Sequence, residues 1–237
     1  MPDYTDATVT IATFNERENL PLVLPLIAEH APGLNVLIID DDSPDGTGQV
    51  ADEFAAEHPF VQVMHRPRKS GYASAHIQGM QRAIAGGAKR LLTMDADLSH
   101  DPAVLPAILD GLAEHDMILG SRYVPGGGTR NWGLFRRLLS RFGSFYARTI
   151  LGLRQRDCTT GYRGYRADLV QRSGMLDTAT QGYGFLVEVL YRCVTAGAKV
   201  GEVPIIFVDR QYGQSKLSKA IMFEAMLLPW RLRFRRR

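Results

Sequence analysis

Short apolar runs alternate with amphipathic stretches along this chain, and most of the apolar runs end at polar or acidic residues. Runs of this length are typical of strands buried in a parallel sheet. They predict strands at residues 8–13, 36–39, 61–64, 91–94, 117–120 and 200–208, with a short further strand within 157–166. Helical spacing predicts helices that end near residues 30 and 58, and helices at about 72–85, 102–114, 134–151 and 185–195. This alternation predicts an α/β fold with a mainly parallel sheet flanked by helices.

The chain changes character after Ser121, where a glycine-rich loop at 124–129 precedes the predicted helix at 134–151. Three arginines share one face of this helix, and its apolar residues form a separate stripe. We expect the stripe to pack against the core; the alternative is a basic amphipathic helix lying on a membrane surface. The basic face holds Arg137, Arg141 and Arg148, and the stripe holds Leu134, Phe135, Leu138, Leu139, Phe142, Phe145 and Tyr146.

Residues 218–237 also combine apolar side chains with a terminal arginine cluster. This segment is too short and too interrupted by charge to span a bilayer, but it suits a membrane surface or a membrane partner. We therefore divide the chain into a domain at 1–217 and an amphipathic basic tail at 218–237, with amphipathic helical elements expected toward the C-terminus. We expect no signal peptide and no transmembrane segment, because residues 1–6 are largely polar and no apolar run is long enough to cross a bilayer.

Composition narrows the possible partners. The chain has 237 residues, of which 45% are hydrophobic and 22% are charged, as in ordinary globular proteins. Its net charge is only +3, yet eleven arginines face two acidic residues between Ser121 and Arg172. This asymmetry indicates an anionic partner, which could be phosphate, nucleic acid or a lipid surface. Two cysteines far apart predict neither a disulfide framework nor a zinc site.

Acidic residues follow three of the predicted strands. Glu16 follows the first strand, residues 40–42 follow the second, and Asp95 and Asp97 follow the strand at 91–94. Because the carboxyl ends of parallel strands meet at one edge of the sheet, we expect these acids to converge there. Paired carboxylates at such an edge suit Mg²⁺ or Mn²⁺ carrying a diphosphate. The alternative is a set of independent acidic turns and helix caps.

Basic residues of the second half can supply the opposite charge. Arg122 follows the strand at 117–120, and Arg210 and Lys216 lie in a loop rich in glycine and serine. Any one of them could be an ordinary surface charge. Together, beside an acidic metal site, they predict a clamp for a diphosphate.

Five blocks of sequence, taken in order, match one family pattern. The chain resembles dolichol-phosphate (polyprenol-phosphate) mannosyltransferases, which are inverting family-2 glycosyltransferases of the GT-A fold. The resemblance covers nearly the whole chain, and the five blocks in register are far more specific than the paired aspartates alone. The blocks are residues 13–16 (TFNE), 39–47 (IDDDSPDGT), 95–100 (DADLSH), 120–123 (GSRY) and 210–216 (RQYGQSK).

The resemblance implies roles for individual residues. The donor pocket, for GDP-mannose, would be formed by Ala12, Phe14, Glu16, Ile39, Asp41 and Ala96. Asp95 and Asp97 would bind Mg²⁺ or Mn²⁺, and Arg122, Arg210 and Lys216 would contact the donor diphosphate and the acceptor phosphate. Arg136, Arg137 or Ser140 would assist with the acceptor, and the pattern leaves open which of them does so. At Ala12 and Phe14 the sequence departs from the family, which usually has Pro and Tyr there.

The implied reaction transfers mannose from GDP-mannose to a dolichyl or polyprenyl monophosphate with inversion. Asp95, Asp97, Arg122 and Lys216 would act as catalytic residues through the metal and the leaving diphosphate. Because the acceptor phosphate is bonded to a chain that stays in lipid, we expect the protein at the cytoplasmic face of a membrane, held peripherally or by a membrane-anchoring subunit. We expect no nucleic acid partner.

Three other functions compete with this interpretation. The same fold and site could use another sugar nucleotide, such as UDP-glucose, on a polyprenyl phosphate. Asp95 and Asp97 after an apolar strand also resemble the motif of haloacid-dehalogenase-type phosphohydrolases, which would require Thr or Val in place of Ser99. A non-catalytic membrane or nucleic-acid binding module would explain the arginines, but it leaves the three acidic strand ends unexplained.

Overall fold

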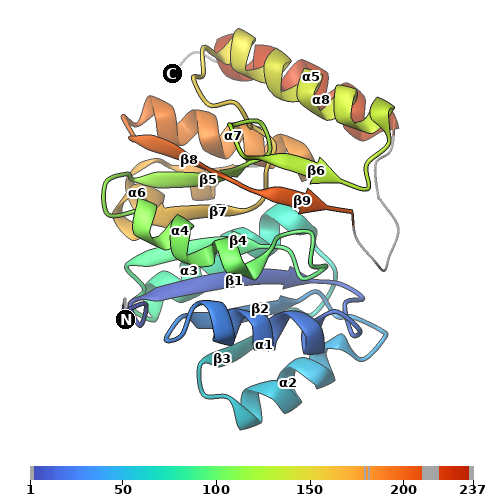
Figure 1. Ribbon diagram of the computed structural model, residues 1–237, viewed down its shortest axis with the longest axis vertical. Helices are drawn as coiled ribbons and strands as arrows, with labels where there is room; N and C mark the ends of the chain where they lie inside the picture. Colours follow the sequence, from blue (N-terminus) through green and yellow to red (C-terminus); the bar gives the residue numbers. More distant parts are fainter. Residues whose placement is uncertain (1–2, 179, 181, 210–218, 235–237) are drawn as a thin grey trace.

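A seven-stranded sheet with helices on both faces forms the body of the molecule (Figure 1). The structure is a computed structural model and describes residues 3–178, 180, 182–209 and 219–234. Neighbouring strands are parallel, except that β7 is antiparallel to both β4 and β5. The mainly parallel α/β fold is therefore confirmed. The strands follow the order β3 (Val61–His65), β2 (Asn35–Asp40), β1 (Ala7–Thr13), β4 (Arg90–Met94), β7 (Arg163–Arg166), β5 (Met117–Ser121) and β8 (Val200–Pro204).

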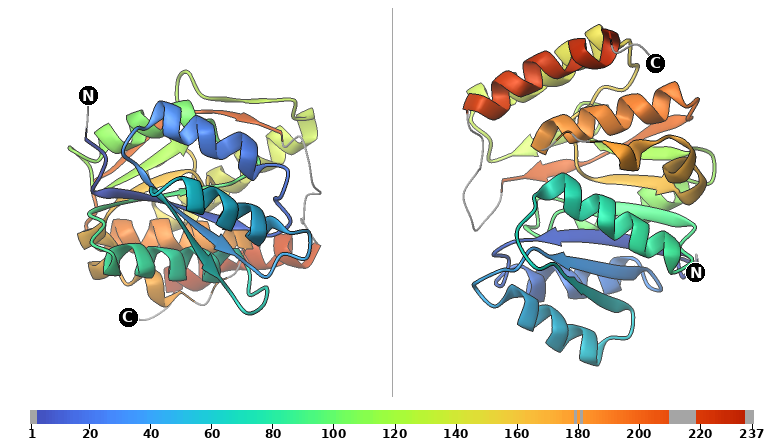
Figure 2. Two further views of the ribbon diagram at one scale, coloured as in Figure 1. Left: turned by 90° about the horizontal axis from the view of Figure 1, so that it is seen from below. Right: turned by 180° about the vertical axis from the view of Figure 1, so that it is seen from behind.

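Helices cover the two faces of the sheet and enclose separate hydrophobic cores. One face carries α1 (Leu20–His30), α2 (Thr47–Glu57), the short 3₁₀ helix η1 (Pro102–Val104) and α4 (Leu105–Gly111). The other carries α3 (Tyr72–Ala85), α6 (Ala167–Arg172), the 3₁₀ helix η2 (Met175–Asp177) and α7 (Gly182–Thr195) (Figure 2). Alternate side chains of a strand point to opposite faces, so strands covered on both faces are apolar throughout. In β4, for example, Leu92 and Met94 enter the first core and Leu91 enters the second.

A fully buried histidine interrupts the apolar packing between β1 and α3. The Nδ1 atom of His76 lies 3.3 Å from the hydroxyl of Thr10, which donates a hydrogen bond to the Leu92 carbonyl. The Nε2 atom has no hydrogen-bond partner among the described residues. Burial, with smaller effects of the charges of His100 and Arg163, lowers the pKa of His76 from 6.5 to about 3. The folded protein therefore keeps this imidazole neutral over most of the acidic range.

We expect His76 to make the protein lose stability as the pH falls from about 6.5 toward 3. In this window the unfolded chain binds a proton at His76 that the folded chain does not, so the free energy of unfolding decreases by roughly 1.4 kcal/mol per pH unit. Above pH 6.5 this contribution is constant. Urea unfolding at several pH values should give a shallower pH dependence for His76→Leu than for the native protein, and equal slopes would contradict the prediction.

Two predicted elements differ from the structure. The predicted strand at 200–208 is two strands, because β8 ends at Pro204 and β9 (Ile206–Val208) leaves the main sheet to pair with β6 (Gly128–Arg130). Pro204 has no backbone N–H to continue a ladder. The predicted helix at 102–114 is also shorter, since α4 ends at Gly111 and the next residues form tighter turns, with the Leu112 N–H donating to the Leu109 carbonyl.

Two helices lie side by side at one end of the molecule, α5 (Leu134–Leu151) and α8 (Lys219–Phe234) (Figures 1 and 2). Trp230 Nε1 donates to the Tyr146 hydroxyl, which in turn donates to the Met226 carbonyl. The predicted boundary between residues 217 and 218 falls outside the described residues. No helix of the described residues is both long and apolar enough to cross a bilayer.

The prediction that the apolar stripe of α5 packs against the core was wrong. The side of α5 that faces the core presents Ser144, Ala147 and Leu151, so the contact is made by mostly small residues. Most of the stripe faces outward, with exposed fractions between 41% and 78% at Leu134, Phe135, Leu138, Leu139, Phe142 and Phe145. Helix α8 adds the exposed residues Met226, Leu227, Trp230 and Phe234. Exposed apolar residues in such number typically mark a binding surface.

Candidate active site

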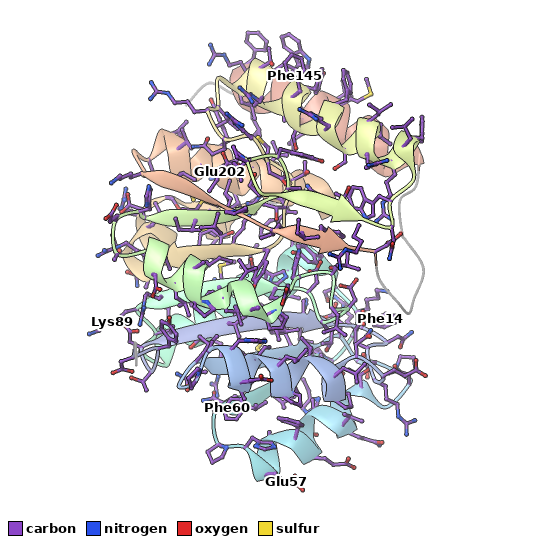
Figure 3. All side chains as sticks on the ribbon, viewed as in Figure 1. Phe14, Glu57, Phe60, Lys89, Phe145 and Glu202 are labelled. Atoms are coloured by element: carbon purple, nitrogen blue, oxygen red, sulfur yellow. The ribbon has the colours of Figure 1, made fainter. Side chains whose placement is uncertain are left out.

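The three acidic segments meet at the carboxyl edge of the sheet, as predicted. Strand β1 lies between β2 and β4 and is parallel to both, with Thr13 opposite Asp40 and Ile11 opposite Met94. The loops that carry Glu16, Asp41 and Asp95 therefore leave the sheet side by side. Figure 3 shows Phe14 at this edge and Lys89 at the opposite edge.

Backbone strain is concentrated in the same three loops. The described residues include four non-glycine residues with positive φ, and three of them are Asn15 (62°), Asp42 (57°) and Leu98 (58°). The fourth, Asn131, lies in the loop before α5. The left-handed region is unfavourable for L-residues and is occupied mainly where the surrounding structure enforces it, often at functional sites. Each acidic loop thus contains one left-handed residue, and the conformation is costly at Leu98, since asparagine and aspartate tolerate it.

Asp40 and Asp41 fix the loops on the β2 side of this edge. Asp40 accepts hydrogen bonds from the backbone and hydroxyl of Ser43 and from Thr13. Asp41 Oδ1 lies 2.7 Å from Arg66 Nη1, and Asp41 Oδ2 accepts the backbone N–H groups of Ser70 and Gly71, each at 3.2 Å. Both carboxylates are buried. Asp41, which the family pattern assigns to guanosine, therefore also holds the loop that precedes α3.

The β1 loop supplies an aromatic ring and a carboxylate. Phe14 is half-buried, and Lys69 Nζ lies 3.4 Å from the centroid of its ring. The Glu16 backbone N–H donates to Thr47, and its carboxylate accepts a 2.6 Å hydrogen bond from Asn19. These contacts tie the loop to the start of α1 and to α2.

Two apolar members of the predicted donor pocket are deeply buried. Ile39 has no exposed surface, and a Cβ on Gly79 of α3 would approach its Cδ1 to 2.7 Å, so the Ile39 side chain packs against α3 and not against open space. Ala96 is 3% exposed, and Ala12 is half-buried.

Asp95 and Asp97 lie in a tight loop after β4. The Asp95 side chain is 34% exposed, while Asp97 is buried and its Oδ1 accepts the Ser99 backbone N–H at 3.1 Å. The Ser99 hydroxyl is also buried, and its oxygen forms no hydrogen bond with the described residues. Two carboxylates one residue apart beside an unsatisfied hydroxyl are the hard oxygen donors that a divalent cation such as Mg²⁺ or Mn²⁺ prefers.

His100 fixes the backbone of this loop, a role that the sequence did not reveal. The Asp95 N–H donates to His100 Nδ1 at 3.0 Å, so the neutral ring carries its proton on Nε2. The ring is stacked on Tyr162 at 4.8 Å between centroids. Burial lowers the pKa of His100 to about 4, although the negative charges of Asp97 and Asp157 act in the opposite direction. His100 therefore accepts the Asp95 N–H as a neutral side chain.

Arg122 is held by a buried carboxylate that the sequence analysis did not single out. Its Nε and Nη2 donate to the two oxygens of Asp157, each at 2.7 Å, and Nη2 also donates to Thr159. Burial alone would raise the pKa of Asp157, but the Arg122 charge and the hydrogen bonds from Arg122 and Thr159 hold it below its usual value. Arg122 is 7% exposed, so its guanidinium is oriented before any ligand binds.

An aromatic group connects Arg122 to the Asp95 loop. The guanidinium carbon of Arg122 lies 5.6 Å from the ring centroids of both Trp132 and Phe207. Phe207 contacts the His100 ring edge-on, and the neighbouring Val208 N–H donates to the Ser99 carbonyl at 3.4 Å. Strand β9 thus brings the cationic half of the site against the acidic half.

Arg136, rather than Arg137, lies beside this aromatic group. Its guanidinium carbon is 4.1 Å from the Trp132 centroid, and Nη1 donates to both oxygens of Asp209 at 2.8 Å. Arg137 is exposed, and its side chain forms no hydrogen bond or ion pair with the described residues. Ser140 accepts a 2.7 Å hydrogen bond from Tyr123. Arg210 and Lys216 lie outside the described residues.

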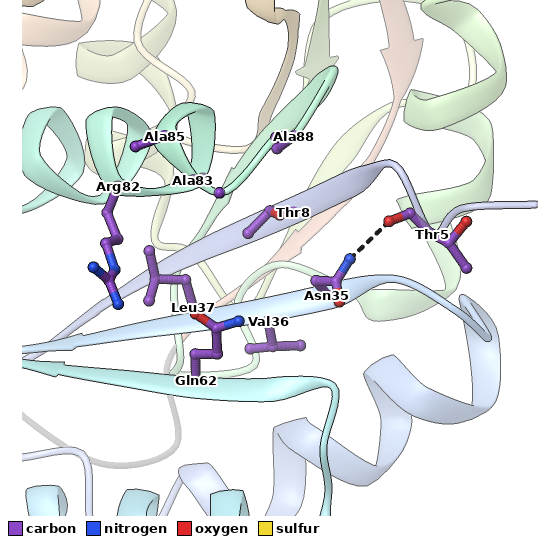
Figure 4. Close-up of a pocket in the computed structure, with 12 residues that line it drawn as sticks. Thr5, Thr8, Asn35, Val36, Leu37, Gln62, Arg82, Ala83, Ala85 and Ala88 are labelled. Carbon is purple, nitrogen blue, oxygen red and sulfur yellow. Dashed lines mark hydrogen bonds between the residues drawn. The ribbon is translucent and has the colours of Figure 1, made fainter.

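A cavity lies at the other edge of the sheet. It has a volume of about 350 Å³ and is lined by residues from the amino ends of β1 and β2 and the end of α3, including Thr8, Asn35 and Ala88 (Figure 4). Ligands of open α/β sheets bind at the carboxyl ends of the strands. This cavity contains no carboxylate and is not the candidate site.

A match to a family model shows which protein family the chain belongs to. Residues 8–174 match the family model described as "Glycosyl transferase family 2". The chain belongs to glycosyl transferase family 2. The match spans the acidic edge, Arg122, α5 and Asp157.

Two relatives match this family 2 glycosyltransferase over most of its length. It is 44% identical over 217 residues to the undecaprenyl-phosphate mannosyltransferase of Micrococcus luteus, with 92% of this chain and 89% of that protein covered. It is 42% identical over 231 residues to the polyprenol monophosphomannose synthase of Mycolicibacterium smegmatis, with 96% and 87% covered. Each alignment therefore covers most of this chain and most of the relative.

Solved structures confirm the GT-A-like fold of this family 2 glycosyltransferase. The glucosyl-3-phosphoglycerate synthase of Mycobacterium tuberculosis matches with a TM-score of 0.66 at 16% identity, covering 94% of this chain and 79% of that one. A mannosyltransferase from Pyrobaculum calidifontis matches with a TM-score of 0.59 at 17% identity, covering 91% and 60%. At these identities the similarity concerns the fold alone.

Proposed function

We propose that this protein transfers a mannosyl group from GDP-mannose to a polyprenyl monophosphate, giving polyprenyl β-mannosyl phosphate and GDP. The observation that carries the proposal is an acidic sheet edge next to a buried, oriented arginine, in a chain 42–44% identical to two polyprenyl-phosphate mannosyltransferases. The Pyrobaculum calidifontis neighbour is a complex with GDP-Man and Mn²⁺, which supports the choice of donor and of a divalent cation.

The donor would bind across the carboxyl ends of β1, β2 and β4. Glu16 and Asp41 can accept hydrogen bonds from the base and the ribose, and the half-buried Phe14 offers an aromatic surface to the base. Asp95 and Asp97, with the free Ser99 hydroxyl nearby, would hold Mg²⁺ or Mn²⁺. When bound, this cation would neutralise charge on the leaving diphosphate.

The proposed phosphate-binding half comprises Arg122, Arg136 and, from the family pattern, Arg210 and Lys216. The Asp157 carboxylate aims the Arg122 guanidinium and prevents its rotation toward solvent. A preoriented donor of this kind stabilises developing negative charge without reorganising during the reaction. Lys216 and Arg210, which follow β9 in the sequence, would contact the phosphates.

The acceptor supplies its own nucleophile. A phosphate monoester has a second pKa of about 6 and is largely a dianion at neutral pH, so it needs no strong general base. Its oxygen forms the new bond to the anomeric carbon as the bond from that carbon to the diphosphate breaks, and GDP leaves with the electron pair. One such displacement inverts the α-linked donor to a β-linked product. The residues of this site act by positioning and charge stabilisation.

A transfer assay tests the proposal directly. The protein should transfer label from GDP-mannose to a short-chain polyprenyl phosphate when Mg²⁺ or Mn²⁺ is present, and chelation should stop the transfer. Unlabelled GDP should compete, whereas UDP-glucose should not. Transfer from UDP-glucose with no transfer from GDP-mannose would replace the proposed donor.

We also propose that the outward face of α5 and α8 rests on the membrane that contains the acceptor. Its exposed Phe135, Phe142 and Trp230 can enter the interface, and neighbouring arginines can approach anionic lipids. Each basic residue near such a surface contributes on the order of 1 kcal/mol, and salt screens this attraction. A membrane-anchoring subunit would be the alternative means of attachment.

We expect the purified protein to bind vesicles of phosphatidylcholine and phosphatidylglycerol reversibly, and less strongly as salt rises. Phe135→Gln with Phe142→Gln should weaken binding by roughly tenfold or more, because the two rings no longer enter the apolar interface. Leu22→Gln, a substitution of an exposed residue on α1, is the matched control. Flotation without vesicle association at low salt would reject direct docking and favour an anchoring subunit.

A further inference from the structure

A pocket lined by arginines lies beside the exposed apolar stripe of α5, separate from the acidic sheet edge. It has a volume of about 320 Å³ and is lined by Tyr123, Arg141, Phe145, Arg148 and Arg156. Pockets of about 300–1,000 Å³ are large enough for a small ligand or a lipid headgroup. Arg141, Phe145 and Arg148 are three and four residues apart on α5, so they share one face of the helix.

The charges of this pocket are not neutralised within the described chain. Arg141, Arg148 and Arg156 form no ion pair with a carboxylate of the described residues. Two acidic residues lie close in the chain or the fold, and both have other partners. Asp157 binds Arg122, and both oxygens of Glu202 accept backbone N–H groups, from Arg156 and Asp157. Three guanidinium groups around one cavity therefore attract an anion.

The position of the pocket indicates what that anion is attached to. Phe145 lines the pocket and is also 59% exposed, at the end of the apolar stripe of α5 (Figure 3). A ligand with its phosphate among the arginines could therefore lay an acyl chain along that stripe. Tyr123 separates the pocket from the candidate active site, because its ring also lies 5.2 Å from the Arg122 guanidinium carbon.

We infer that this pocket binds the phosphate of an anionic phospholipid and thereby fixes the orientation of the protein on the membrane. The inference rests on the proposed membrane attachment. The bound lipid is not the acceptor: Arg122 and Arg136 serve the acceptor phosphate, and the pocket arginines hold a lipid of the surrounding bilayer. Guanidinium groups suit this task because they donate several hydrogen bonds to phosphate oxygens.

Calorimetry with a soluble short-chain lipid tests the pocket without a membrane. The native protein should bind dihexanoyl phosphatidylglycerol, below its micelle concentration, at one saturable site. Dihexanoyl phosphatidylcholine, whose net charge is zero, and inorganic phosphate should bind much more weakly. Arg141→Gln with Arg148→Gln should weaken lipid binding by more than about tenfold. Arg130→Gln with Arg154→Gln, which removes two exposed arginines outside the pocket, should change it less than about twofold.

Three results would overturn the inference. Equal weakening by both double variants would mean that diffuse charge attracts the lipid, and equal affinity for inorganic phosphate would mean that the pocket takes free phosphate. Loss of mannosyl transfer by Arg141→Gln with Arg148→Gln in a phospholipid-free assay would assign the pocket to the acceptor. If the double variant does not fold, as judged by circular dichroism, Arg156→Gln alone replaces it. Lipid binding is measured without mannosyl transfer. The test therefore remains valid even if the proposed transfer reaction is not observed.

Discussion

Asp97→Asn should reduce mannosyl transfer by at least about 10²–10³-fold while leaving the fold intact. The amide is isosteric and can still accept the Ser99 N–H, but it cannot supply the negative charge that a divalent cation requires. Losing a main source of charge stabilisation at the leaving group costs a factor of this size. Single-turnover rates over a series of Mg²⁺ and Mn²⁺ concentrations would measure the loss.

Asp42→Asn is the matched control for this experiment. Asp42 lies at the same edge of the sheet and is exposed, and Asn tolerates the left-handed conformation that it adopts. The control also removes one negative charge from this region, but Asp42 is not a proposed metal ligand. It should therefore retain most of the activity. Full activity of Asp97→Asn at low, buffered metal would reject Asp97 as a metal ligand. A comparable loss in both variants would mean that the net charge of the edge matters, rather than one ligand.

Asp157→Asn should lower the free energy of unfolding by about 3–5 kcal/mol and strongly reduce transfer. The carboxylate is fully buried and receives three hydrogen bonds from Arg122, two from the guanidinium and one from the backbone N–H. Replacing it by a neutral amide leaves a buried guanidinium without its counter-charge. An uncompensated buried charge strongly destabilises the folded state. Urea unfolding measures the first effect and the transfer rate measures the second.

Asp168→Asn shows what the same change does at an exposed pair. Asp168 contacts Arg166 at 3.2 Å and Arg172 at 3.7 Å, and its side chain is 58% exposed. Exposed pairs of this kind contribute roughly 0–1 kcal/mol, so this variant should be nearly as stable as the native protein. Similar destabilisation by both substitutions would show that burial does not determine the value of the Arg122–Asp157 pair.

The carboxyl edge of the sheet was predictable because two simple rules locate it. Short apolar runs mark the parallel strands, and ligands of open α/β sheets bind where the strands end, so Glu16, Asp41 and Asp95 had to converge. The pairing of Arg122 with Asp157 was not predictable in this way. The two residues are 35 positions apart, and a single aspartate in a turn looks like any other turn residue. His100 was similarly hidden, because its role depends on its backbone contact with Asp95.

The apolar stripe of α5 shows a different limit of sequence patterns. Helical periodicity identifies which residues share a face, but it does not identify what covers that face. The packing side of α5 uses Ser144 and Ala147, small residues that carry little hydrophobic signal, and the aromatic side remains exposed. Arg210 and Lys216 remain predictions from the family pattern alone.

Leu98 makes the acidic edge of the sheet a poor place to engineer thermal stability. A left-handed leucine is disfavoured by roughly 1–2 kcal/mol, and glycine at this position would remove that backbone strain. Yet Leu98 packs against the first core, and its backbone sets the turn between Asp97 and the buried His100. Glycine would relieve the strain, but it would also remove the packing of the leucine side chain and loosen the turn, so the relief would bring no net gain in stability. Libraries for thermostable variants should therefore keep Asn15, Asp42 and Leu98 fixed and vary the surface of α1 and α2 instead.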